Sequence, residues 1–251
     1  MVKEPVKPLN IDKLLGNCRN RVYRCGVELE GGWRVVPAGT SLEADGSVFR
    51  GHRPPDCQVG ELPIGPMQPA AMPKFMKKYY PHKVDATCGM HIHMSFENLL
   101  HYAWLEVEEY QETLLHYLTQ WAKEEGFPEK HDIWERLAGK CVFCQKKFWP
   151  DEQVFYKQKD HDQHRNGHRY TIVHYCGRQN TIEIRVLPMM SEVKQAIRAV
   201  SQVIDITNAC LVLLAKKEER FKGKIELPGG KIYEELVEND LVIKERRRRE
   251  W

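Results

Sequence analysis

The sequence offers little that would suit a protein of membranes or of the cell exterior. Its apolar runs fall short of the roughly 20 residues that a membrane span needs, so no membrane partner is expected. The first residues, Met1–Pro8, lack the apolar core of a signal peptide. We therefore expect a cytoplasmic protein, in which the 8 cysteines serve as thiols or metal ligands and not as disulfides.

An excess of charge of one sign is also missing. The net charge of +3 gives no strong attraction to nucleic acid. The exception is the basic run Lys244–Arg249, which we interpret as a solvated tail in preference to a contact with RNA or DNA. The 251 residues are enough for a large domain with a real core. We predict one domain over residues 1–215 and a charged C-terminal extension over residues 216–251.

Two common motifs of nucleotide-binding proteins and hydrolases are absent. The chain has no P-loop of the form Gly-x-x-x-x-Gly-Lys-Ser/Thr, so a bound nucleotide would have to lie on a sheet and not in a helix-capped loop. It also has no serine–histidine–aspartate pattern. That absence is consistent with phosphoryl transfer, which needs positioning and charge neutralisation instead of a protein nucleophile.

Three short triplets share one pattern of side chains. Glu28–Glu30, His91–His93 and Glu183–Arg185 each place two polar or charged groups on either side of one apolar residue. On a strand the two outer side chains point to the same face and the middle one to the opposite face. A strand with one wet face alternates in the same way, but three triplets made only of Glu, His and Arg favour a site. We predict that neighbouring strands gather them to bind divalent cations and phosphate.

The pattern of apolar residues predicts an α+β fold. Periodicity indicates strands over residues 20–36, 170–175 and 181–187 and helices over 97–125 and 191–215, whereas the proline- and glycine-rich residues 51–81 suggest a looping crossover. We expect a curved, largely antiparallel sheet with helices on one side. The triplets would then face the uncovered side, forming an open, concave active-site floor.

The triplets also resemble a known superfamily. Gly89–Ser95, with the sequence Gly-Met-His-Ile-His-Met-Ser, resembles the Gly-Met-His-x-His-Met-Ser signature of glutamine synthetases. Gly26–Glu30 and Thr181–Arg185 resemble the Glu-x-Glu and Glu-x-Arg strands of the same superfamily, in the same order. The chain is similar in length to the amidoligases, smaller carboxylate–amine ligases of bacteria and phages. Further similar segments are Asp45–Ser47, Gly60–Pro66 and Gly167–Tyr170.

The resemblance implies a glutamine-synthetase-type catalytic domain over residues 1–215 and a set of roles within it. Arg185, Arg169 and Glu61 would be catalytic, with the two arginines stabilising the charge of the transferred γ-phosphoryl group. His93, Arg185 and Tyr170 would contact the nucleotide. The general base is left open between His174 and Glu61. The resemblance and the oxygen preference of Mg²⁺ together assign two Mg²⁺ or Mn²⁺ ions to Glu28, Glu30, Glu61, His91 and Glu183.

The expected reaction is the ATP-dependent joining of a carboxylate and an amine. ATP would phosphorylate the carboxylate, and attack of the amine on the acyl phosphate would give an amide, ADP and phosphate. The substrates would be small molecules or peptides. One alternative is a phosphotransferase on the same scaffold. Another is a zinc-stabilised binding module, with Cys141, Cys144, His161 and His164 as ligands, although two ordinary thiols are the preferred interpretation of the cysteine pair.

Overall fold

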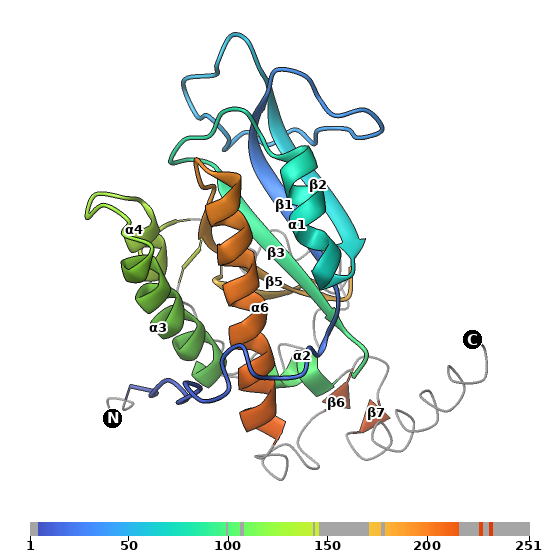
Figure 1. Cartoon of the computed structure of the whole chain (residues 1–251), viewed down its shortest axis with the longest axis vertical. Coiled ribbons are helices and arrows are strands. Elements are labelled where there is room, and N and C mark those ends of the chain that lie inside the picture. Colours follow the sequence, from blue (N-terminus) through green and yellow to red (C-terminus); the bar gives the residue numbers. More distant parts are fainter. Residues whose placement is uncertain are drawn as a thin grey trace, which may run out of the picture.

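The structure, a computed structural model, contains an antiparallel sheet with helices packed against one face (Figure 1). Its five strands lie in the order β2-β1-β3-β5-β4, and every neighbouring pair is antiparallel. The α+β class and the antiparallel sheet are thus confirmed. The structure describes residues 5–98, 100–105, 108–142, 144–145, 171–176, 179–215, 226–227 and 231–232.

The elements follow the chain in a simple order. The five strands of the sheet are β1 (Val22–Trp33), β2 (Gln58–Met67), β3 (Gly89–Phe96), β4 (Val173–Cys176) and β5 (Thr181–Pro188). The helices are η1 (Pro69–Ala71), α1 (Met72–Tyr79), α2 (Leu100–Leu105), α3 (Glu108–Glu124), α4 (Ile133–Leu137) and α6 (Val193–Ala215). A separate pair of short strands is formed by β6 (Glu226–Leu227) and β7 (Lys231–Ile232).

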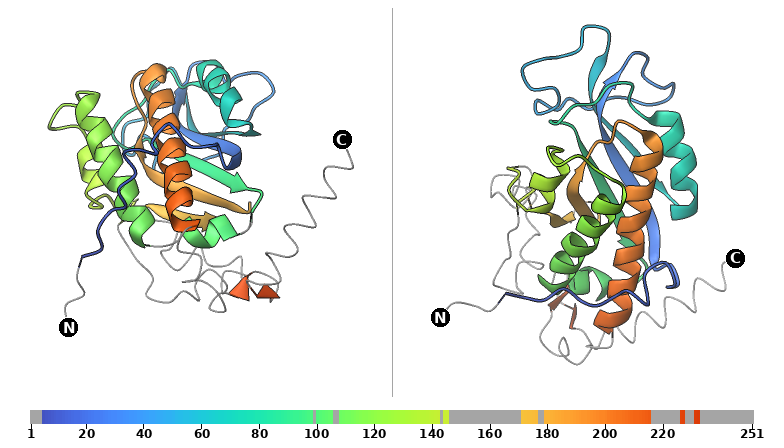
Figure 2. Two further views of the ribbon diagram at one scale, coloured as in Figure 1. Left: turned by 60° about the horizontal axis from the view of Figure 1, so that its bottom comes forward. Right: turned by 60° about the vertical axis from the view of Figure 1, so that its left-hand side comes forward.

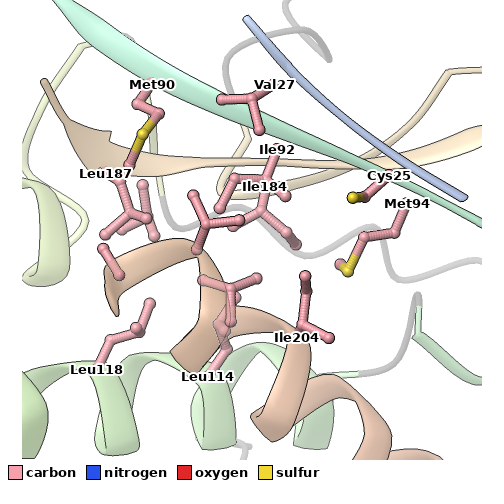
Figure 3. Packing of buried hydrophobic residues seen from close by; sticks show 14 of the residues in the cluster. Cys25, Val27, Met90, Ile92, Met94, Leu114, Leu118, Ile184, Leu187 and Ile204 are labelled. Carbon is pink, nitrogen blue, oxygen red and sulfur yellow. The ribbon is translucent and has the colours of Figure 1, made fainter. Parts of the chain in front are cut away.

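The sheet divides its side chains into an apolar face and a polar face. On β3, Met90, Ile92 and Met94 are fully buried on the side of the helices, and the intervening histidines point the other way. Figure 3 shows the apolar layer, in which strand residues such as Ile92 and Ile184 lie above Leu114 of α3. This layer fixes which residues of each strand face the opposite side, because a slip of one residue would exchange the two faces.

Helix α6 occupies the centre of the helical layer. It packs against α1, α2 and α3, and the views of Figures 1 and 2 place it across the middle of the sheet. The segment Val193–Leu214 is long and apolar enough to cross a membrane. No apolar run of that length was expected from the sequence. However, 61% of the most apolar window is buried inside the protein, as in the core helix of a soluble protein.

The segment before β1 is bound to the outside of α3. The Leu9 N–H donates to Thr113 Oγ1 at 2.7 Å, and the Ile11 N–H donates to the Tyr117 hydroxyl at 3.0 Å. That hydroxyl in turn donates to Asp12 Oδ1 at 2.7 Å. Since Ile11 is fully buried, this N-terminal segment extends the core beyond the helical layer.

The prediction for residues 51–81 is partly wrong. This stretch contains a full strand, β2, and a helix, α1, in place of a mainly looping crossover. The prolines Pro63 and Pro66 are compatible with the strand because β2 is the edge of the sheet, where a missing N–H costs no ladder hydrogen bond. The predicted helix over residues 97–125 is also divided into α2 and α3, of which the first begins at Leu100.

Candidate functional site

The three triplets lie on adjacent strands, as predicted. Strand β3 is paired with β1 on one side and β5 on the other. Glu28 lies opposite His91 in the first pair, and His93 lies opposite Glu183 in the second. The polar members of the triplets therefore form a row across the sheet face that does not carry the apolar layer.

The imidazole of His91 lies at the centre of this row. Its Nδ1 is 3.1 Å from Glu28 Oε2 and 3.5 Å from Glu183 Oε1, while its Nε2 is 3.5 Å from Glu30 Oε1. One ring thus contacts carboxylates from both neighbouring strands. With only 4% of its surface exposed, His91 holds these carboxylates in an environment of low dielectric.

Glu61 joins the row from the edge strand β2. It is paired with Glu30 across the sheet, and its own N–H and carbonyl both bond to the backbone of Glu43. The donor atoms of Glu30, Glu61 and His91 lie within 4.8 Å of one another, as do those of Glu28, His91 and Glu183. Two possible ligand groups with one shared histidine therefore lie side by side, and together they contain every metal ligand expected from the sequence.

The carboxylates of the site titrate differently from one another. Burial, together with the charges of Glu28 and Glu30, raises the pKa of Glu61 to about 9. Burial also favours the neutral form of Glu28, but contacts with His91 and His93 outweigh it and lower the pKa of Glu28. The raised pKa of Glu61 indicates that the carboxylates carry more negative charge than the nearby histidines and Arg185 balance. Such a site attracts a further cation.

The two ring nitrogens of His93 contact side chains of the two strands that flank β3. Its Nε2 is 2.9 Å from Glu28 Oε1, and its Nδ1 is 3.0 Å from Thr181 Oγ1. Although burial opposes it, the Glu28 carboxylate raises the pKa of His93. Thr181 was not predicted as a site residue, but its position two residues before Glu183 on a strand could have indicated the shared face.

Arg185 contacts the row from the end of its own triplet. Its Nη1 donates to Glu183 Oε1. Burial opposes ionisation of Glu183, but the Arg185 guanidinium and the two imidazoles lower the pKa of that carboxyl. The Nε of Arg185 is buried without a hydrogen-bond partner in the described part of the chain. A buried, unpaired donor beside a possible metal group is a suitable contact for an anion.

Comparisons with protein families, curated proteins and solved structures find no match for this chain. The functional argument therefore depends on the geometry of the site.

Arg136 approaches the site beside Gly89 and was not predicted as a site residue. Gly89 donates its N–H to Glu30 Oε2 at 2.5 Å. A Cβ at this glycine would lie 3.0 Å from His91 Nε2 and 3.4 Å from Nη1 of Arg136, a buried residue of α4. Arg136 comes from a segment without a clear pattern, so nothing in the sequence marks it as a neighbour of the site.

Strand β4 adds two further side chains that could bind a metal at the other end of the row. His174, which was predicted as a possible base, lies opposite Glu183. Cys176 donates its Sγ–H to Glu183 Oε2 at 3.2 Å. Burial and the charge of Glu183 raise the pKa of the Cys176 thiol, which makes it a poor nucleophile. The donor atoms of His174, Cys176 and Glu183 also lie within 4.8 Å of one another.

The expected open floor is covered at its centre. Glu30 and Glu183, like His91, are each only 4% exposed, whereas Glu28 and Glu61 are partly exposed. Arg136 contributes to this cover at the Gly89 end of β3, where it donates to the Cys88 carbonyl at 3.4 Å. Access from solvent is thus better at Glu28 and Glu61 than at the middle of the row.

Several predicted residues lie outside the described part of the chain. Among them are Arg169 and Tyr170, the two histidines of the zinc hypothesis at 161 and 164, and the basic run near the C-terminus. Cys141 and Cys144 are described, and the Cys144 N–H donates to the Cys141 carbonyl at 3.2 Å. Both are free thiols, and a zinc site there stays a prediction.

Proposed function

We propose that this chain is an ATP-dependent carboxylate–amine ligase with a glutamine-synthetase-type sheet, similar to the amidoligases. The observation that carries the proposal is the convergence of Glu28, His91 and Glu183 from three adjacent strands, with donor atoms within 4.8 Å of one another. Arg185 contacts the same carboxylate. The antiparallel sheet with helices on one face is compatible with this fold type.

The donor set fits divalent cations that bind phosphates. Carboxylate oxygens are the preferred ligands of Mg²⁺, and an imidazole in the set extends the preference to Mn²⁺. Glu30 and Glu61 would hold one ion. Glu28, His91 and Glu183 would hold the other. The two cations would supply neutralisation of the triphosphate charge.

The cationic side chains fit the phosphates themselves. The unpaired, buried Nε of Arg185 is a donor for a γ-phosphoryl oxygen, and an arginine placed there stabilises the charge of a transferring phosphoryl group. His93 would contact a phosphate from the neighbouring strand. These side chains do not need to form a covalent bond with the substrate, because the carboxylate of the substrate is itself the nucleophile.

The second half of the reaction needs a proton acceptor for the amine. Glu61 is one candidate for this role, since it is partly exposed and lies at the better accessible end of the row. His174 is the alternative base, on the opposite side of the row at β4. Attack of the amine on the acyl phosphate forms the C–N bond, breaks the C–O bond to phosphate, and releases the amine proton to this base.

Hydroxylamine provides the test of the ligase proposal. The protein is incubated with ATP, Mn²⁺, hydroxylamine and a pool of amino acids, peptides and other carboxylates. We expect hydroxamate and ADP, and neither from a Glu183→Gln control. AMP with pyrophosphate would overturn the proposal in favour of adenylation, and a phosphorylated product that resists hydroxylamine would indicate the phosphotransferase. The identity of the hydroxamate would reveal the carboxylate substrate.

A further inference from the structure

Strand β4 places a different kind of ligand beside the carboxylate groups. His174 and Cys176 are two residues apart and share the face that carries Glu183 on the adjacent strand. They supply an imidazole and a sulfur, in contrast to the oxygens of Glu30 and Glu61. Neither residue is assigned as a metal ligand by the proposed ligase mechanism.

The two oxygens of Glu183 point to different partners. Oε1 is contacted by Arg185 and lies 3.5 Å from His91 Nδ1. Oε2 accepts the hydrogen bond from Cys176 Sγ at 3.2 Å. A carboxylate in this position has one oxygen available to each side, so ions in the two neighbouring groups could share it as a bridging ligand.

The geometry points to a third metal site beside the two carboxylate groups: we propose that His174, Cys176 and Oε2 of Glu183 bind Zn²⁺. Three ligands of the S, N and O types match the donors that zinc accepts, with a fourth tetrahedral position open to water. Ligand atoms in such a site are separated by about 3.5 Å. The ligand atoms of His174, Cys176 and Glu183 lie within 4.8 Å of one another. They would need to move only slightly closer together to reach that distance.

The position of the site allows an ion to enter. Strand β4 is at the edge of the sheet, and both His174 and Cys176 are partly exposed, whereas Glu183 is buried. Binding converts the Cys176 thiol to a thiolate, with its proton released to the solvent. The sulfur ligand selects Zn²⁺ over Mg²⁺, so this site and the two carboxylate sites on the same face would bind different cations.

Cobalt is the spectroscopic probe for this site. We expect Co²⁺ added to the full chain to give the thiolate charge-transfer absorption, and this absorption to be lost in Cys176→Ser. A Cys144→Ala control should keep it. We also expect Zn²⁺ to bind Cys176→Ser at least ~10-fold more weakly than the unaltered chain in calorimetry.

A second measurement keeps the test valid even if Cys176→Ser does not fold. In the unaltered chain, added Zn²⁺ should remove the cobalt thiolate band but Mg²⁺ should not, and His174→Gln should weaken that band. A cobalt band unchanged by Zn²⁺ or by His174→Gln would overturn the proposal, as would a band that survives Cys176→Ser but not Cys144→Ala. A failed hydroxamate assay would leave the zinc site in place, because none of these readouts requires turnover.

Discussion

At the scale of single residues, the site depends on carboxylates whose charge the histidines and Arg185 only partly balance. In Glu28→Gln and Glu183→Gln the side-chain volume is kept while one charge of the proposed metal site is removed. Even loss of a partner of a ligand weakens metal binding by about 10–100-fold, so we expect a loss of Mn²⁺-dependent ATP binding of more than about 100-fold. Calorimetry on folded variants measures it.

The matched control for these two variants is Glu125→Gln. Glu125 is also a paired glutamate, but its partner is Arg198 on the surface, with a 2.5 Å contact to Arg198 Nη2. This variant should bind Mn²⁺ and ATP like the unaltered chain. Normal binding by both Glu28→Gln and Glu183→Gln would show that neither carboxylate is a ligand.

The site also depends on one residue without a side chain. In Gly89→Ala, the new Cβ would lie 3.0 Å from His91 Nε2 and 3.3 Å from Glu30 Oε2, which is too close unless these groups move. We expect metal affinity to fall by about 10-fold, with little change in the unfolding midpoint. Gly46→Ala is the control, because its Cβ would meet nothing within 4 Å. Equal metal affinity in the two variants would show that His91 and Glu30 tolerate displacement.

At the scale of elements, the Tyr117 hydroxyl is one of two α3 hydroxyls that hold the N-terminal segment. Tyr117→Phe removes the acceptor of the buried Ile11 N–H and the donor to Asp12. An unsatisfied buried donor costs about 1–3 kcal/mol, so we expect the free energy of unfolding in urea to fall by that amount. Tyr23→Phe, at an exposed position of β1, should be nearly neutral. A neutral Tyr117→Phe would mean that the segment contributes no stability through these bonds.

The sequence predicts well those elements whose apolar residues recur at a regular spacing within the element itself. The triplets could be placed on strands because the two-residue alternation is local, and β3 and β5 follow the prediction closely. Strand β2 was missed because its prolines argue against a strand unless its place at the sheet edge is known. The approach of Arg136 to Gly89 could not be predicted either, since it depends on the packing of α4 and not on any local pattern.

At the scale of the whole molecule, catalysis is predicted not to need the last residues of the chain. Residues 246–251 lie outside every motif that resembles the ligase superfamily. Deletion of Arg246–Trp251 should therefore leave ATP turnover in the hydroxamate assay unchanged, within about twofold. A large loss of turnover with a small carboxylate substrate would instead assign the tail to the active site.

The order of the strands has a consequence for how the protein is made. Strand β5 lies between β3 and β4 in the sheet but follows both in the chain. A nascent chain that has emerged only through β4 already carries Glu28, Glu30, Glu61 and His91. It still lacks β5, the strand that lies between β3 and β4 in the finished sheet. Since Glu183 arrives with that strand, the group of Glu28, His91 and Glu183 forms only when the sheet is complete. We therefore expect unfinished chains not to turn over ATP until β5 has joined the sheet.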